Sequence, residues 1–240
     1  MQDQVTLDDM AEDIFGLNVR GIRSIGTSWI NPGEYFRSAL GSNWDGRFTP
    51  SIRLWFSLIA LASLLQFIWI GSDTPLVSAY ADGFRNAGVT LTSGLTFEAL
   101  GERAALWIYA IAPVFQLLLF LLCLAFIPLW GRKTTYSLRV RFLFIAMIPS
   151  GSLMAAFLPA MALVPATHLT ALGLILGVAT FFLDAITSYR GAFQELRTFA
   201  RIWRSALLAA IILALNVVAN IAAQIAGIVL VTNQYGLSVS

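Results

Sequence analysis

Three amide side chains lie four residues apart in the C-terminal apolar segment: Asn216, Asn220 and Gln224. In a helix this spacing places them along one side, in a stripe that drifts slowly around the axis. An amide group left unpaired in lipid costs several kcal/mol, so the stripe is expected to face the interior of a helical bundle or a wet cavity. Gln116, in another apolar segment, is expected to join this network. The stripe either holds helices together or lines a polar path.

Two titratable groups lie in the preceding apolar segment. Asp184 is near its end, and an acid in such a segment is by default a candidate for function. Arg190 follows within two turns, so Asp184 either serves a site or reaches the membrane interface and pairs there. His168 begins the segment, where a lone histidine is more typical of an interfacial hydrogen-bonding group than of a catalyst.

Sequence motifs of known enzyme classes are missing. The chain has no HExxH, no GxSxG, no phosphate-binding glycine loop and no paired carboxylates in its apolar segments. A dyad of Ser150 or Ser152 with His168 would need a mid-membrane serine to meet a histidine near the surface. With one His and one Cys (Cys123), neither a His-rich metal site nor an intramolecular disulfide is expected. The sequence therefore favours a non-enzymatic protein without metal or cofactor.

The overall composition indicates that lipid surrounds the chain. Hydrophobic residues make up 58% and charged residues 12% of the 240 residues, and the mean hydropathy is +0.77. Soluble domains carry about 25% charged residues. The net charge of +2 gives no reason to expect a nucleic-acid partner. The acidic N-terminus lacks the basic region of a cleaved signal peptide.

Five apolar runs are near or above the roughly 20 residues that cross a hydrocarbon core, and in lipid such runs are helices. They predict an all-α integral membrane protein, a bundle of five transmembrane helices in a domain of residues 51–240. Pro113 and Pro128 are expected to kink the second helix, and Pro149 to Ser152 to weaken the third. The spans are residues 52–70, 104–130, 142–164, 168–186 and 206–231.

Basic residues lie mostly on one side of this topology. All of the 15 Lys and Arg residues except Arg85 and Arg103 lie before or at the start of the first span, or follow the second and fourth spans. The positive-inside rule then places the N-terminus in the cytoplasm and the C-terminus outside, in the periplasm of a bacterial inner membrane.

The loop after the fourth span is expected to form a basic amphipathic helix over residues 190–204 that runs on into the fifth span. Its arginines either anchor the topology or bind anionic lipid head groups, each contributing about 1 kcal/mol. Arg132 and Lys133, in the loop after the second span, are assigned the same role. The four arginines of this helix are Arg190, Arg197, Arg201 and Arg204.

Residues 1–50 are expected to form a cytoplasmic, amphipathic segment. Phe15, Ile22, Ile25 and Trp29 recur at near-helical spacing, which suits either a helix in the membrane interface or one packed on the bundle. A second short helix begins with Pro32 after a capping Asn31. In the long outer loop, Thr74 is expected to start a helix that ends near Gly88.

The segment leading into the first span resembles the pre-membrane signature of a bacterial membrane family of unknown function. That signature has a Pro-Gly step, an aromatic and a basic residue, and then Arg-aromatic-x-Pro-x-x-Arg-Leu. The five-span plan with a cytoplasmic N-terminus also resembles the Yip family of membrane-trafficking proteins. The matching residues are Pro32, Gly33, Phe36, Arg37, Arg47, Phe48, Pro50, Arg53 and Leu54.

These observations favour an inner-membrane protein that binds lipid or a membrane-protein partner, or that organises the bilayer. A homodimer is one form of such a partner, because the last span has a face of small residues. A small transporter or channel subunit with a polar path beside that span is the alternative, and an intramembrane hydrolase is the least favoured.

Overall fold

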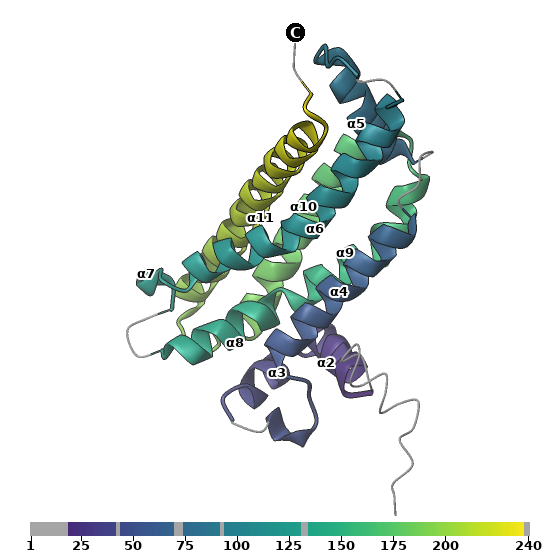
Figure 1. The fold of residues 1–240 in the computed structure, drawn as a ribbon. Coiled ribbons are helices and arrows are strands. Elements are labelled where there is room, and N and C mark those ends of the chain that lie inside the picture. Colours follow the sequence, from purple (N-terminus) through teal and green to yellow (C-terminus); the bar gives the residue numbers. More distant parts are fainter. Residues whose placement is uncertain (1–18, 42–43, 70–73, 92–93, 131–133, 238–240) are drawn as a thin grey trace, which may run out of the picture. The chain divides into compact units, whose positions relative to one another are not determined.

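The computed structural model describes residues 19–41, 44–69, 74–91, 94–130 and 134–237. Within these ranges the chain is helical and has no β-strand, as the composition predicts (Figure 1). The helices are α2 (Val19–Ile30), α3 (Pro32–Ser38), η1 (Trp44–Gly46), α4 (Ser51–Trp69), α5 (Pro75–Asn86), α6 (Phe97–Cys123), α7 (Ile127–Trp130), α8 (Tyr136–Ala146), α9 (Ile148–Leu163), α10 (Ala166–Arg190) and α11 (Thr198–Tyr235).

Four helical segments of the described chain are long and apolar enough to cross a membrane. They are Phe97–Cys123, Tyr136–Ala160, Thr167–Arg190 and Thr198–Tyr235. α4 has 19 residues, and its apolar stretch Ser51–Gln66 is shorter than these four segments. These four candidate spans are consistent, by length and composition, with an integral membrane protein, and the fifth span stays a prediction.

The segment predicted as the second span is not one helix. α6 ends at Cys123, and Pro128 lies in the separate short helix α7, so only Pro113 is inside a long helix. A proline has no N–H for the helix ladder, and its ring clashes with the carbonyl four residues earlier. For Pro128 that carbonyl belongs to Leu124, and the chain turns there. The Leu124 oxygen instead accepts a hydrogen bond from Arg139 at 3.1 Å.

The predicted weak point of the third span also appears as a break. α8 ends at Ala146 and α9 begins at Ile148, with Met147 between them. Pro149 is the second residue of α9, a position where the missing N–H is tolerated because helix starts have free N–H groups anyway. The break therefore lies just before the proline rather than within residues 149–152.

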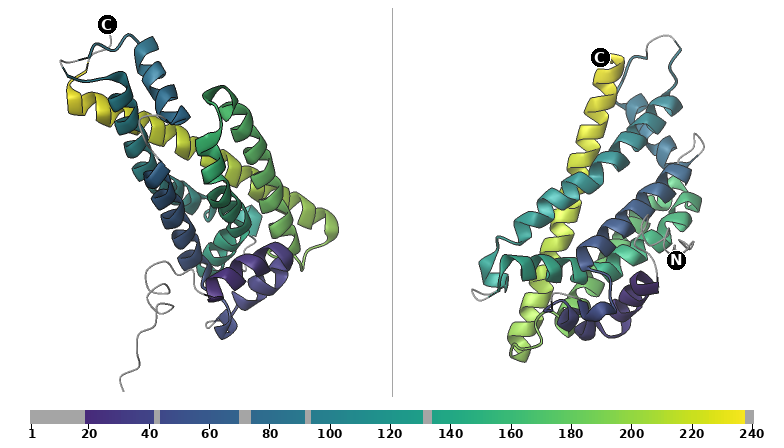
Figure 2. Two further views of the ribbon diagram at one scale, coloured as in Figure 1. Left: turned by 90° about the vertical axis from the view of Figure 1, so that its right-hand side faces the viewer. Right: turned by 60° about the horizontal axis from the view of Figure 1, so that its bottom comes forward.

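Both short helices predicted outside the spans are confirmed. α3 has Pro32 in its first turn, although the Asn31 side chain does not cap the backbone and instead donates to Glu34 Oε2 at 3.3 Å. α5 follows Thr74, whose hydroxyl accepts from the Val77 N–H. α2 and α3 pack side by side (Figure 2). Phe15 lies outside the described residues, so α2 is described only from Val19.

The chain divides into two compact units, and several helices contribute a part to each. Unit 1 comprises residues 1–61, 121–155 and 177–213. Its buried aromatic centre is Tyr35, whose ring lies 5.5 Å from that of Trp44 and 5.4 Å from that of Phe48. The Tyr35 hydroxyl donates to the Thr49 carbonyl at 2.6 Å. Burial raises the pKa of Tyr35, so the phenol stays protonated and remains a donor.

Unit 2 comprises residues 62–120, 156–176 and 214–240. Two glycines allow its helices to approach closely. A Cβ at Gly101 would lie 2.6 Å from the Val77 carbonyl oxygen of α5, and one at Gly227 would lie 2.5 Å from Ile108 Cγ1 of α6. The core residues are Phe84, Val89, Leu100, Ala104, Ile108, Ala223 and Val231.

Replacing Gly101 by Ala tests the contact between α5 and α6. We expect Gly101→Ala to destabilise the protein by about 1–3 kcal/mol, because the added methyl group meets backbone that cannot move aside cheaply. The midpoint of thermal unfolding in detergent should fall by several degrees. Gly83→Ala is the matched control, since a Cβ there meets nothing within 4 Å. That control should be neutral or slightly stabilising, and an equal loss in both variants would contradict the close contact.

Candidate functional site

Five arginines of unit 1 bind backbone carbonyl groups at or near the ends of helices. The last carbonyls of a helix have no partner within it, and a guanidinium cation suits the negative end of the helix dipole. The contacts join Arg139 to Leu124 at the end of α6, Arg141 to Ala39 and Gly41 after α3, Arg190 to Ile30 of α2, Arg201 to Tyr189 of α10, and Arg204 to Leu129 of α7.

Arg141 makes the most extensive of these contacts. Its Nη1 lies 2.6 Å from the Ala39 oxygen and 2.8 Å from the Gly41 oxygen. Its guanidinium also lies over the Trp44 ring, 5.5 Å from the centroid. No local pattern in the sequence indicates this role, because the arginine and its acceptors are about 100 residues apart.

The amphipathic helix predicted over residues 190–204 is interrupted. α10 continues to Arg190, a turn follows, and α11 begins at Thr198. A Cβ at Gly191 would overlap the Phe36 ring, and Phe193 is buried with its ring 6.2 Å from that of Trp130. The turn therefore packs inward. The helix does run on into the last apolar segment, as predicted, but only from Thr198.

The arginines of that predicted helix consequently differ in role. Arg190, Arg201 and Arg204 bind carbonyl oxygens, whereas Arg197 is exposed in the turn. Arg132 and Lys133 lie outside the described residues.

The residues of the pre-membrane signature surround α3. Pro32, Gly33 and Phe36 are buried, and a Cβ at Gly33 would lie 3.0 Å from the Arg190 oxygen. Arg37 donates to the Gly33 carbonyl at 3.2 Å. Phe48 is buried against Tyr35, whereas Pro50 and Arg53 are exposed where α4 begins.

Arg47 connects two residues of the same region. Its guanidinium lies 3.3 Å from a Glu34 carboxylate oxygen and 5.5 Å from the centroid of the Phe48 ring. Most residues of the pre-membrane signature therefore take part in the packing around α3.

α2 has its large apolar side chains on the outside. Its buried residues are the small ones, Gly21, Ser24 and Ser28. Trp29 is half-exposed, and its indole N–H donates to Ser152 Oγ at 2.9 Å. We call the outward face the α2 surface; its members are Val19, Arg20, Ile22, Arg23, Trp29 and Ile30, all exposed.

Asp184 is buried at the point where α9 and α10 meet. Its side chain is 2% exposed, and Ser150 of α9 lies within hydrogen-bonding reach of the carboxyl group. The Oδ1 atom has no hydrogen-bond partner among the described residues. Asp184 does not pair with Arg190 at the interface, since that arginine binds the Ile30 carbonyl at 2.7 Å.

Two further buried hydroxyl groups of unit 1 share this lack of a partner. They belong to Ser188, one turn after Asp184 on α10, and to Ser205 on α11. We refer to Asp184, Ser150, Ser188 and Ser205 as the Asp184 cluster. The spacing of four residues between Asp184 and Ser188 places both on one side of a helix, which the sequence alone shows. No pattern in the sequence links Ser205 to these two residues.

The amides of α11 do not gather in one interior network within unit 2. Asn216 is half-buried, but Asn220 and Gln224 are exposed, and Asn220 donates to the Asn216 carbonyl of its own helix at 2.9 Å. The neighbouring small face of Ala219, Ala223 and Gly227 is buried instead. Gln116 is half-buried on α6, and no hydrogen bond joins it to Asn216 in the described chain.

The side chains considered for a hydrolase have other contacts. The Ser150 hydroxyl donates to the Met147 carbonyl at 3.1 Å, and the Ser152 hydroxyl donates to the Pro149 carbonyl at 2.9 Å. His168 is exposed near the start of α10. No group of three or more His, Cys, Asp or Glu side chains suited to a metal ion occurs in the described part of the chain.

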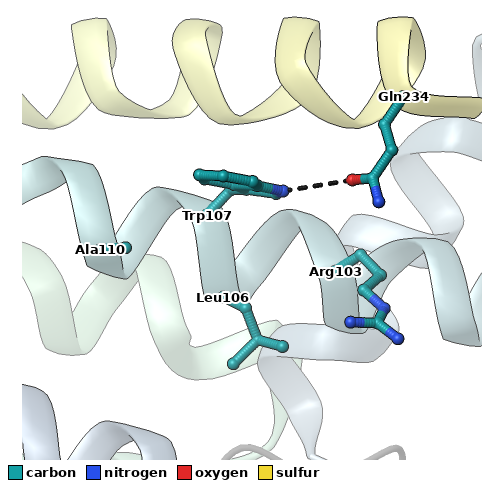
Figure 3. A pocket seen from close by; sticks show the side chains of 5 residues that line it. All are labelled: Arg103, Leu106, Trp107, Ala110 and Gln234. Atoms are coloured by element: carbon teal, nitrogen blue, oxygen red, sulfur yellow. Dashed lines mark hydrogen bonds between the residues drawn. The ribbon is translucent and has the colours of Figure 1, made fainter.

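A shallow hollow of unit 2 lies between α6 and α11 (Figure 3). Its one polar contact is from the Trp107 indole N–H to Gln234 Oε1, at 3.4 Å. The lining residues are Arg103, Leu106, Trp107, Ala110 and Gln234. With few polar groups directed into it, this hollow has little to select a ligand.

Comparison with protein-family models, with curated proteins and with solved structures gave no match. The resemblances drawn from the sequence therefore stay predictions.

Removing the Arg141 guanidinium tests the carbonyl contacts. We expect Arg141→Gln to cost about 1.5–3 kcal/mol, the usual contribution of a hydrogen bond to a charged group. The unfolding midpoint in detergent should fall, and protease should cut more readily after α3. Arg197→Gln is the matched control, because that side chain is exposed, and it should change stability by less than about 0.5 kcal/mol. Equal behaviour of the two variants would show that the Arg141 contacts contribute nothing.

Proposed function

We propose that the chain is a non-enzymatic inner-membrane protein whose α2 surface binds anionic lipid head groups on the cytoplasmic side. The observation that carries the proposal is the orientation of α2, with small residues inward and large apolar residues outward beside two arginines. A helix that exposes isoleucine and tryptophan beside arginine suits the membrane interface, where the apolar groups enter the acyl region and the cations meet phosphate.

The start of α11 supports the same placement. Phe199 is 84% exposed, and Ile202 and Trp203 are also exposed, close in sequence to Arg197. Arg190 joins the end of α10 to Ile30 of α2, and Arg201 of α11 binds the Tyr189 carbonyl of α10. Both surfaces therefore belong to the same end of unit 1. Aromatic residues are enriched at this depth of a membrane, and cytoplasmic segments carry an excess of arginine.

The experiment separates head-group binding from fold stability. Arg20 and Arg23 are exposed and, unlike Arg141 or Arg190, hold no helix end. We expect the full-length protein in detergent to retain phosphatidylglycerol more strongly than phosphatidylcholine in native mass spectrometry. The double variant Arg20→Gln/Arg23→Gln should weaken phosphatidylglycerol retention roughly thirtyfold, at about 1 kcal/mol for each arginine, with an unchanged unfolding midpoint.

Arg103→Gln is the control for charge alone, because Arg103 is exposed but belongs to unit 2. It should leave phosphatidylglycerol retention unchanged. The proposal fails if the wild-type protein does not distinguish the two lipids, or if the control variant loses as much binding as the double variant.

A second function, self-association, is favoured by the exposed amides of α11. The helix has 38 residues, a length of about 57 Å, which exceeds the roughly 30 Å of a hydrocarbon core. With Arg204 at the cytoplasmic boundary, Asn220 lies inside the core and Gln224 near its outer edge. Lipid cannot hydrogen-bond these amides. We propose that a second copy of the chain covers them, since amides both donate and accept and so pair with their own kind about a twofold axis.

Disulfide cross-linking in native membranes tests self-association. In a Cys123→Ala background, Gln224→Cys should give a covalent dimer on oxidation. Ile225→Cys is the matched control. Ile225 is 59% exposed and lies at nearly the same depth as Gln224, but it points about 100° away from Gln224 around the helix axis, so it should cross-link far less. Equal cross-linking at both positions, or none at residue 224, would refute the proposed interface.

A further inference from the structure

We infer that the Asp184 cluster binds a monovalent metal cation inside the membrane domain. This inference does not depend on the lipid-binding or self-association proposals. It starts from three buried oxygen atoms of unit 1 that have no hydrogen-bond partner among the described residues: Asp184 Oδ1, Ser188 Oγ and Ser205 Oγ. A buried polar group without a partner is costly, so such a set calls for a ligand that all of its members can contact.

Two contacts fix the register between α10 and α11. Arg201 of α11 binds the Tyr189 carbonyl of α10, and its guanidinium lies 4.0 Å from the centroid of the Tyr189 ring. A Cβ at Gly177 would lie 3.9 Å from Leu213 Cδ1. From the Gly177–Leu213 pair to the Tyr189–Arg201 pair, the residue number rises by twelve on α10 and falls by twelve on α11. The two helices are therefore antiparallel. The same register sets Ser205 opposite residue 185, between Asp184 and Ser188.

The faces of both helices agree with this register. Asp184 is seven residues after Gly177, two helical turns, and so lies on the side of α10 that meets α11. On α11, Ser205 shares its buried stripe with Leu208, Ala209 and Ile212. Ser150 approaches the Asp184 carboxyl from α9. The cluster is therefore built by three helices, each of which directs a polar side chain to the same place.

The chemistry of these groups selects the ligand. All are oxygen atoms, which suits a hard cation and not a metal that prefers nitrogen or sulfur. A single carboxylate balances one positive charge, and Asp184 is the only acidic residue between Glu102 and Glu195. It forms no ion pair with a described residue. A divalent ion would leave a buried excess charge and usually takes several carboxylates. The serine hydroxyls add neutral oxygen ligands without changing that balance.

The cluster lies close to one end of α10. Asp184 precedes Arg190 by six residues, about 9 Å along the helix axis. The cluster thus lies slightly below the arginine-rich end of unit 1, within the apolar segment Thr167–Arg190. An oxygen-lined cation site at such a depth gives the protein a means of binding an ion from the cytoplasmic side.

The test measures the thermal stability of the full-length protein in detergent while NaCl or KCl replaces choline chloride at constant ionic strength. We expect one of the two metal ions to raise the unfolding midpoint by about 3–6 °C for each tenfold increase above its Kd. Asp184→Asn keeps the shape of the side chain and should abolish this dependence. Ser205→Ala should shift the dependence to at least several-fold higher cation concentration.

Asp82→Asn is the control, because Asp82 is an exposed carboxylate paired with Arg85 in unit 2. It should retain the full response to the metal ion. The readout is the dependence on cation concentration rather than the stability of each variant, so a less stable Asp184→Asn protein still gives an answer. An unfolding midpoint that is the same in NaCl, KCl and choline chloride, or an unchanged dependence in both Asp184→Asn and Ser205→Ala, would overturn the inference.

Discussion

The carbonyl groups at helix ends are the constraint on which unit 1 depends. A long apolar helix satisfies its own backbone everywhere except at its termini, where the last carbonyls need donors from elsewhere. Here arginines supply those donors, and each contact joins a helix end to another part of the chain, as Arg141 does for α3 and Arg190 for α2. Because a guanidinium has five donors in a planar fork, one side chain can bind two carbonyls at once.

These contacts change how the basic loops should be interpreted. Arginines near a membrane surface are usually assigned one of two roles: they set the orientation of the chain in the membrane, or they bind anionic lipid head groups. In this protein Arg190, Arg201 and Arg204 have a structural acceptor, so their positive charge also stabilises the fold. The arginines of the α2 surface are exposed and are joined there by large apolar side chains. Lipid binding is therefore better sought at α2 than in the loop after α10.

Polar groups in the apolar helices fall into two kinds. The amides Asn220 and Gln224 are exposed in the described chain, and Asn220 makes one hydrogen bond to its own helix, to the Asn216 carbonyl. Asp184 and its serine neighbours are buried, so only a small ligand such as the proposed cation fits among them. The first arrangement is suited to association between chains and the second to binding an ion. Neither has the nucleophile and base in contact that hydrolysis needs.

The sequence by itself determined the all-helical class, the long apolar segments and the short helices α3 and α5, because hydropathy, proline position and capping residues act locally. It also placed the interruption near Pro149 closely. It did not reveal that α6 stops at Cys123, that the turn after Arg190 folds inward on Phe36 and Trp130, or that Ser205 belongs with Asp184. Only the tertiary structure decided those points. The physical reason is that the rotation and register of one helix against another select which side chains meet, and residues about 100 positions apart, such as Arg141 and Ala39, carry no local pattern that records their contact.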